Sequence, residues 1–134
     1  MLLTKASEYA LLSIFCISGR TEPIDVDTLS STVGISKSFL AKILQKLTKN
    51  GILKSYKGVR GGFVLARPIA QISVLDIIKA VEENAAAVFE CTTDSKCCPS
   101  ERIHACMIWP TFIKLQGKID TFLANMTLEE ILSK

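Results

Sequence analysis

The clearest hydrophobic pattern in the chain lies in residues 36–50. Its apolar side chains follow the i, i+3, i+4, i+7 spacing of a single helical stripe. Ser36 before the stripe suits an N-cap, and Asn50-Gly51 after it suits the end of a helix. The sequence therefore predicts an amphipathic helix. Its apolar stripe comprises Leu40, Ile43, Leu44 and Leu47, and its opposite face comprises Lys37, Ser38, Ala41, Lys42, Gln45, Lys46 and Lys49.

Two short strand-like runs follow this helix, at residues 52–56 and 63–65. The six residues that join them, Lys57-Gly58-Val59-Arg60-Gly61-Gly62, include three glycines. A glycine-rich turn between half-buried strands is typical of a β-hairpin. The helix and the hairpin together indicate the recognition helix and the wing of a winged helix-turn-helix.

The pattern before this unit predicts two further helices. The first begins after Thr4 as N-cap and continues to about Ser18, and its apolar residues include Cys16. The second runs from about Asp25 or Asp27 to Val33. Gly34-Ile35 then forms the turn into the basic helix, which is the spacing of a helix-turn-helix.

The pattern after the hairpin predicts three more helices. Ser73 begins one that runs to about Glu83, and Thr127 begins a short terminal one. Between them, a long helix is expected from about residue 103 to 124, with Pro110 in its first turn or at a kink. The predicted fold is mainly α with a small β-hairpin wing: a winged helix-turn-helix followed by a long C-terminal dimerisation helix.

Three stretches follow from these elements: a DNA-binding part at 1–83, a cysteine-rich loop at 84–102, and helices at 103–134. The long helix exposes more apolar surface than the first 83 residues can cover. We therefore expect it to pair with its copy in a symmetric homodimer, which would present two recognition helices to a palindromic operator. The predicted interface comprises Ile108, Trp109, Phe112, Leu115, Ile119 and Phe122.

Charge is distributed unevenly along the chain. Residues 1–70 carry ten Lys and Arg against four Asp and Glu, whereas residues 71–134 carry six against nine. Residues 37–67 hold eight Lys and Arg and no acid. A lysine-rich helix face is often simply solvated, but here the positive charge continues into the hairpin. Double-stranded DNA is therefore the predicted partner.

Four of the five cysteines lie within sixteen residues: Cys91, Cys97, Cys98 and Cys106. An odd number of cysteines in a protein expected to be cytoplasmic argues against a disulfide framework. Thiolates are soft ligands for iron-sulfur clusters and zinc. An iron-sulfur cluster, a zinc site, a thiol or disulfide switch, and unliganded cysteines are the alternatives at this stage.

The whole chain resembles the Rrf2 family of bacterial winged helix-turn-helix transcriptional regulators, the IscR and NsrR type. The resemblance implies a homodimeric DNA-binding regulator whose long helix forms the interface. The motifs that carry it are Leu3-Thr4-Lys5, Ile35-Ser36-Lys37-Ser38-Phe39-Leu40, Leu47-Thr48-Lys49-Asn50-Gly51, Lys57-Gly58-Val59-Arg60-Gly61-Gly62-Phe63, the Trp109 helix and Leu128-Glu129.

The resemblance also implies roles for single residues. Ser38, Phe39 and Lys42 would face the major groove of DNA. Lys57, Arg60, Gly61 and Gly62 would enter the minor groove, and Thr4, Lys5 and Tyr9 would touch phosphates. Ser36, Lys37 and Lys46 complete the predicted DNA surface. Ala41 and Lys42 replace acidic and amide side chains of some relatives, so the operator sequence need not be the one that those relatives bind.

Relatives that carry a cluster place three cysteines before the dimerisation helix, which implies Cys91, Cys98 and Cys106 as ligands to a two-iron or four-iron cluster. Cys97, His104 and Glu8 are further candidates, the last because some relatives use an acid of the first helix of the other subunit. The spacing here departs from the family pattern, since Ile103 stands where the last cysteine is usual. This departure leaves the ligand set and the cluster type open.

Other function classes find less support. The single histidine, His104, lies two positions from Cys106, a spacing that sends their side chains to different helix faces. The chain has no phosphate loop or metalloprotease motif, so we expect no enzyme. A regulator that senses a metabolite or a protein partner without a cluster is the alternative. No apolar run approaches 18 residues, which predicts a cytoplasmic protein without membrane contact.

Overall fold

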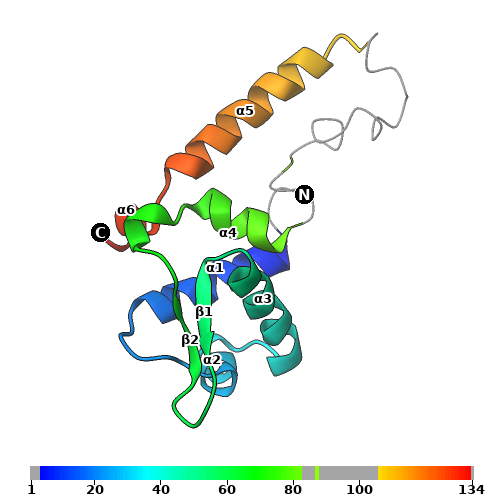
Figure 1. The fold of residues 1–134 in the computed structure, drawn as a ribbon. Helices are drawn as coiled ribbons and strands as arrows, with labels where there is room; N and C mark the ends of the chain where they lie inside the picture. The colour runs from blue at the N-terminus through cyan, green and yellow to red at the C-terminus, as the bar shows by residue number, and fades with distance from the viewer. Residues whose placement is uncertain (1–3, 83–86, 88–105, 134) are drawn as a thin grey trace.

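The computed structural model describes residues 4–82, 87 and 106–133. It is mainly helical, with one antiparallel hairpin, and α5 extends as an arm away from the winged-helix body (Figure 1). The predicted fold class is confirmed. The elements are α1 (Lys5–Ser18), α2 (Val26–Val33), α3 (Lys37–Lys49), β1 (Leu53–Tyr56), β2 (Gly62–Leu65), the 3-10 helix η1 (Ile69–Gln71), α4 (Val74–Val81), α5 (Trp109–Asn125) and α6 (Leu128–Leu132).

Local signals place the helix-turn-helix as the sequence predicts. Asp25 caps α2, because its carboxylate accepts a hydrogen bond from the Thr28 amide at 3.4 Å. Gly34 ends α2 in the left-handed conformation, with φ of 72°. Its amide donates to the Ser30 carbonyl at 2.9 Å, and the chain turns directly into α3.

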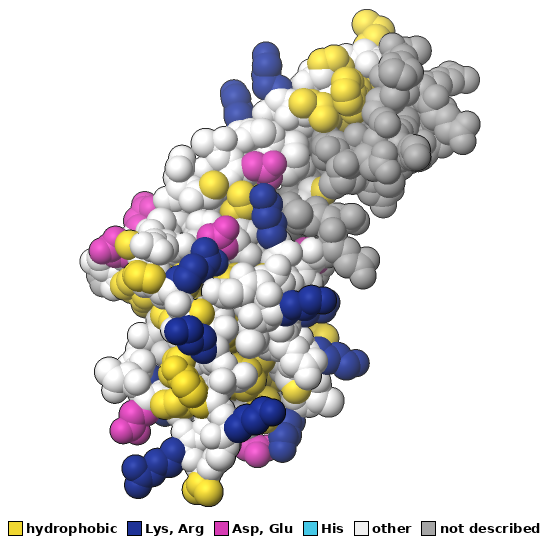
Figure 2. All heavy atoms as spheres, viewed as in Figure 1, with side chains coloured by type: hydrophobic (Ala, Val, Ile, Leu, Met, Phe, Trp, Pro, Cys, Tyr) yellow, Lys and Arg dark blue, Asp and Glu magenta, His cyan; other side chains and the backbone are white. Residues whose placement is uncertain are grey.

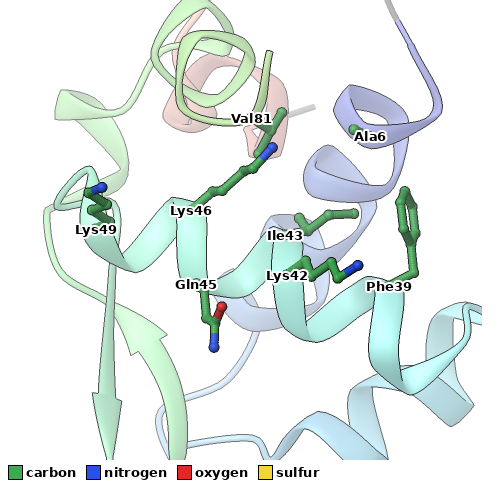
Figure 3. A pocket seen from close by; sticks show the side chains of 8 residues that line it. All are labelled: Ala6, Phe39, Lys42, Ile43, Gln45, Lys46, Lys49 and Val81. Atoms are coloured by element: carbon green, nitrogen blue, oxygen red, sulfur yellow. The ribbon is translucent and has the colours of Figure 1, made fainter. Parts of the chain in front are cut away.

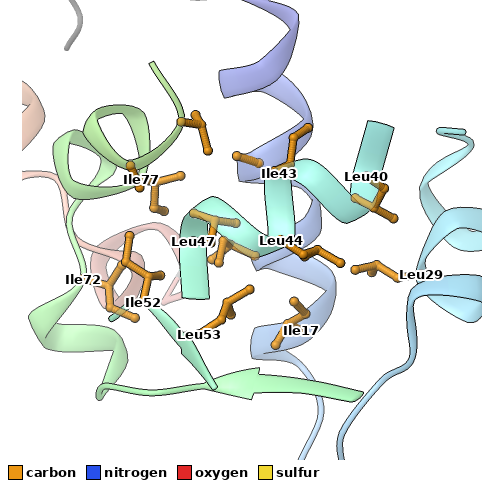
Figure 4. Packing of buried hydrophobic residues seen from close by; sticks show 14 of the residues in the cluster. Ile17, Leu29, Leu40, Ile43, Leu44, Leu47, Ile52, Leu53, Ile72 and Ile77 are labelled. Carbon is orange, nitrogen blue, oxygen red and sulfur yellow. The ribbon is translucent and has the colours of Figure 1, made fainter. Parts of the chain in front are cut away.

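The apolar stripe of α3 forms the centre of the core. Leu40, Ile43, Leu44 and Leu47 are all buried, and they pack among side chains of α1, α2, β1 and α4 (Figure 4). Burying each such side chain stabilises the fold by about 1.5–3 kcal/mol. The recognition helix is therefore fixed by its inner face, which leaves its outer face available for a partner.

The wing hairpin is hydrogen-bonded to the connection before α2. Within the hairpin, Leu53 pairs with Leu65 and Tyr56 pairs with Gly62. In addition, the Phe63 amide donates to the Ile24 carbonyl at 2.9 Å, and the Ile24 amide donates to the Phe63 carbonyl at 3.2 Å. No short-range pattern in the sequence predicts this bridge, which anchors the wing to the body.

Helix α4 begins at a complete capping box. The Ser73 hydroxyl accepts from the Asp76 amide, and the Asp76 carboxylate accepts from the Ser73 amide, both at 3.1 Å. The helix ends at Val81, slightly before the predicted end, and Glu82 is its C-cap. A small second apolar cluster then joins α4 to the C-terminal helices, and its members are Val74, Leu75, Ile78, Leu11, Leu123, Met126 and Ile131.

The long helix begins later than predicted. We expected a start near residue 103, but Cys106, Met107 and Ile108 are not helical and α5 begins at Trp109. Pro110 explains the difference, since a proline inside a helix lacks an amide hydrogen and clashes with the preceding turn. Pro110 lies in the first turn of α5, where a proline is tolerated. This is one of the two positions predicted for it.

Helix α1 buries some of its polar residues and exposes some of its apolar ones. The fully buried residues include two serines, Ser7 and Ser13, whereas Leu12 and Phe15 are exposed. Ser13 is satisfied by donating to the Tyr9 carbonyl at 2.7 Å. The outer side of α1 is therefore an apolar surface without a partner among the described residues.

Candidate nucleic-acid interface

The outer face of α3 presents the predicted DNA-contacting side chains to solvent. Ser38, Lys42 and Lys46 are exposed on the side opposite the buried stripe, and Ser36 is exposed at the N-cap. The Ser36 hydroxyl makes no capping hydrogen bond, contrary to the usual role of an N-cap serine. This hydroxyl therefore remains free to hydrogen-bond with a partner.

An acid from α2 lies beside the start of α3. Lys37 Nζ lies 2.8 Å from Asp27 Oδ1, and this hydrogen bond raises the pKa of Lys37. Asp27 lies ten positions before Lys37 in the sequence, outside the acid-free stretch of residues 37–67. Lys37 consequently offers DNA less net positive charge than the other lysines of this face.

An aromatic contact links α1 to the recognition helix. The rings of Tyr9 and Phe39 meet edge to face, with centroids 5.7 Å apart. Lys5 Nζ lies 5.8 Å from the Tyr9 ring and 3.0 Å from Glu8 Oε2, and its hydrogen bond to Glu8 raises the pKa of Lys5. Three of the predicted DNA contacts, Lys5, Tyr9 and Phe39, are thus neighbours in space.

The wing presents a basic and apolar tip. Lys57 and Arg60 are exposed, as predicted, and Val59 between them is fully exposed as well. A valine held in solvent at the end of a hairpin suits contact with sugar or base edges. No role is predicted for Val59 from the sequence, although it lies inside the glycine-rich turn.

Two of the three wing glycines, Gly61 and Gly62, lie close to other backbone atoms. A Cβ added to Gly61 would lie 2.2 Å from the Tyr56 carbonyl oxygen. Gly62 has φ of 150°, and a Cβ there would lie 2.4 Å from the Ile24 carbonyl carbon and oxygen. Both glycines are half-buried. Their position therefore supports a conformational role in the wing, beside any direct contact with DNA.

An open groove of about 330 Å³ lies beside α3. The residues that line it include Ile43, Val81 and three lysines of α3, Lys42, Lys46 and Lys49. Figure 3 shows Lys46 extended toward Val81. On the face drawn in Figure 2, Lys and Arg side chains are spread over the winged-helix body, and apolar side chains gather at the start of α5. Helix α5 also carries positive charge, since Lys114 and Lys118 are exposed on it.

Most of the predicted metal ligands lie outside the described residues: Cys91, Cys97, Cys98 and His104. Cys106 is half-buried just before α5, and its thiol is not in a disulfide. Glu8 is exposed in the first turn of α1, where the helix dipole favours a carboxylate. Within residues 4–82, 87 and 106–133, no three His, Cys, Asp or Glu side chains gather as a metal site. The ligand set therefore stays a prediction.

The predicted interface residues lie along α5, apart from Ile108, which is its N-cap. Phe122 is 64% exposed, Ile108 51% and Leu115 41%. Phe112, Ile119 and Trp109 are half-buried. From Ile108 onward, five of these residues alternate at spacings of four and three, which is the seam of a coiled coil.

In the part of the chain that the structure describes, no helix is both long and apolar enough to cross a bilayer.

The recognition helix, its buried stripe and the glycine-rich wing define a winged helix-turn-helix DNA-binding protein. Within that class, the chain belongs to the Rrf2 family, described as an iron-dependent transcriptional regulator, which matches residues 3–134. It is 30% identical to the HTH-type transcriptional regulator IscR of Xenorhabdus nematophila, covering 98% of this chain and 79% of the relative. IscR of Cronobacter sakazakii is also 30% identical, over 99% of this chain and 81% of the relative.

Solved structures agree on the fold. An IscR from T. potens superposes with a TM-score of 0.76 at 22% identity, covering 98% of this chain and 85% of that one. CymR (YrzC), the global cysteine regulator of B. subtilis, superposes with a TM-score of 0.74 at 22% identity, covering 98% and 95%. These relatives are transcriptional regulators, and the expectation that the chain is not an enzyme is confirmed.

Proposed function

We propose that this protein is a homodimeric repressor that binds a palindromic operator and whose DNA affinity is switched at its cysteines. The observation that carries the DNA-binding part is the exposed basic face of α3 continuing into the basic wing tip. Several lysines there can each neutralise a phosphate, which supplies affinity and makes it dependent on salt. The bridge between Phe63 and Ile24 fixes the hairpin to the connection before α2, and α2 leads directly into α3.

Lys42→Ala and Arg60→Ala are each expected to weaken binding to a fluorescently labelled duplex. Loss of a phosphate contact should lower the slope of log affinity against log salt by about one, and loss of a base contact should cost about 1–3 kcal/mol. Fluorescence anisotropy over a salt series measures both quantities. Lys114→Ala, an exposed lysine on α5, is the matched control. If both variants bind as tightly as wild type, the DNA surface lies elsewhere.

The homodimer is supported by two exposed apolar surfaces. One is the seam on α5, and the other is the outer side of α1, where Leu12 and Phe15 line a groove of about 380 Å³. Large exposed apolar patches usually mark interaction sites. A symmetric dimer formed through them would bring two recognition helices to the two half-sites of one operator.

The switch is supported by the chemistry of the predicted ligands. Three thiolates that converge on one point suit an iron-sulfur cluster, and the half-buried thiol of Cys106 is available for such a site. When bound there, a cluster supplies a centre that responds to oxygen, nitric oxide or iron supply. IscR relatives and the family description favour iron, whereas the printed title of one fold neighbour, the oxidised form of Staphylococcus aureus CymR, favours thiol chemistry as the second candidate.

Protein purified without oxygen is expected to be brown and to contain iron and sulfide. Cys91→Ala, Cys98→Ala and Cys106→Ala should each lose the colour, because three ligands are the minimum for a stable site. Cys97→Ala should lose least, and Cys16→Ala, the control in the core-facing part of α1, should lose none. Absorbance spectra with iron and sulfide analysis provide the measurement. Colourless protein whose DNA binding still changes between reduced and oxidised states would favour the thiol switch.

A further inference from the structure

The carboxylate of Glu82 joins the end of α4 to the start of α1. The Ser7 hydroxyl donates to Glu82 Oε1 at 2.6 Å, and the Thr4 hydroxyl donates to the same oxygen. Glu82 is the C-cap of α4, and Thr4 is the N-cap of α1. One side chain therefore ties together two helix ends that lie more than 70 positions apart in the sequence.

The surroundings make this contact hard to replace. Ser7 is completely buried and donates its hydroxyl to Glu82, so loss of the carboxylate would remove this partner from a buried polar group. Thr4 gives its hydroxyl to Glu82 instead of capping its own helix, and a carboxylate at the N-terminus of α1 also suits the helix dipole. Burial acts to raise the pKa of Glu82, but the hydrogen bonds from Ser7 and Thr4 outweigh it, so the pKa lies below its ordinary value.

Two of the predicted phosphate contacts, Thr4 and Lys5, lie at the start of α1, but only Lys5 is directed away from α4. The Thr4 hydroxyl is already bonded to Glu82 and is not free for a phosphate. Thr4 and Ser7, three residues apart, face α4, whereas Lys5 is exposed beside Tyr9. The position of Lys5 relative to α3 therefore depends on how the first turn is held. We propose that Glu82 is a positioning residue for DNA binding: it holds the start of α1 so that Lys5 meets the phosphate backbone. This inference rests on the proposed function.

A competing role for Glu82 predicts the opposite change in DNA affinity when the side chain is removed. Lys46 and Lys49 line a groove of about 460 Å³ together with Glu82. If Glu82 were only a negative charge beside these lysines, its removal would strengthen DNA binding. If it positions α1, its removal weakens binding even though a negative charge is lost.

The experiment compares Glu82→Ala, Glu82→Gln, Lys5→Ala and the double variant Glu82→Ala/Lys5→Ala on a labelled duplex of mixed sequence. Glu82→Ala is expected to bind about tenfold more weakly, with a salt slope lower by about one, as in Lys5→Ala. The double variant should match either single variant, because both remove the same contact. Glu82→Gln keeps an oxygen that accepts from both hydroxyls and should bind close to wild type. Glu130→Ala, an exposed glutamate of α6, should change nothing.

Several outcomes would overturn the inference. Tighter binding by both Glu82 variants would show a plain charge effect. A lowered thermal midpoint with an unchanged salt slope would show a structural role alone, and additive losses in the double variant would separate Glu82 from Lys5. Should Glu82→Ala fail to fold, Ser7→Ala removes one of the two donors and is expected to lower the slope partially. If Lys42→Ala and Arg60→Ala also bind the duplex as tightly as wild type, the proposed function itself is overturned.

Discussion

The double variant Leu115→Glu/Phe122→Glu is expected to be a monomer that binds operator DNA at least about 100-fold more weakly than wild type. Both side chains are exposed and lie seven residues apart, so they occupy the same position on the seam of α5. Two carboxylates buried against a second copy would have no partner, and burying unpaired charge is strongly unfavourable.

Sedimentation velocity measures the change in mass, and anisotropy with a labelled operator measures the loss of affinity. The affinity falls because the second half-site is no longer bound as part of the same molecule. Lys114→Glu is the matched control, since it adds a carboxylate at an exposed position about 100° around the helix from Leu115. A wild-type protein that sediments as a monomer would contradict the proposed dimer directly.

Gly62→Ala is expected to destabilise the protein by about 2–4 kcal/mol, because it adds strain and breaks hydrogen bonds between the wing and the body. The new Cβ would lie 2.4 Å from the Ile24 carbonyl and 2.8 Å from the Asp25 amide nitrogen. These are backbone atoms that cannot turn aside, and the two hydrogen bonds between Ile24 and Phe63 hold them in place. The thermal midpoint should fall by about 10 °C.

The matched control for this change is Gly58→Ala in the same turn. Gly58 also has a positive φ, of 108°, but no atom lies within 4 Å of its added Cβ. Its substitution should therefore cost only about 1 kcal/mol of backbone strain. Differential scanning calorimetry on both variants measures the loss of stability. The difference between them separates the cost of steric overlap from the cost of backbone strain. Equal losses would mean that the contact with Ile24 contributes nothing.

Local patterns in the sequence were enough to predict most of the fold. The stripe beginning at Leu40, the left-handed turn at Gly34 and the capping box at Ser73 each depend on residues within a few positions of one another. The start of α5 was predicted too early because apolar spacing was followed upstream of Pro110. The backbone restriction of that proline was the stronger local signal.

The surroundings of the site were harder to predict because they depend on distant residues. Periodicity identified the outer face of α3, but it could not show that Asp27 would pair with Lys37 or that Glu82 would bind Thr4 and Ser7. Leu12 and Phe15 look like core residues in the sequence, and only the packing of α1 against its neighbours shows that they face outward. Such contacts are set by tertiary structure, which a single sequence does not display.

The bridge between Ile24 and Phe63 bears on how freely parts of this protein can be exchanged with those of its relatives. A hairpin transplanted alone, from residue 53 to 65, would meet a connection of foreign length and sequence between α1 and α2. The two backbone hydrogen bonds would then lose their register, and the wing would point in a new direction. A chimera that alters operator preference therefore needs to carry residues 20–25 together with the hairpin as a single cassette.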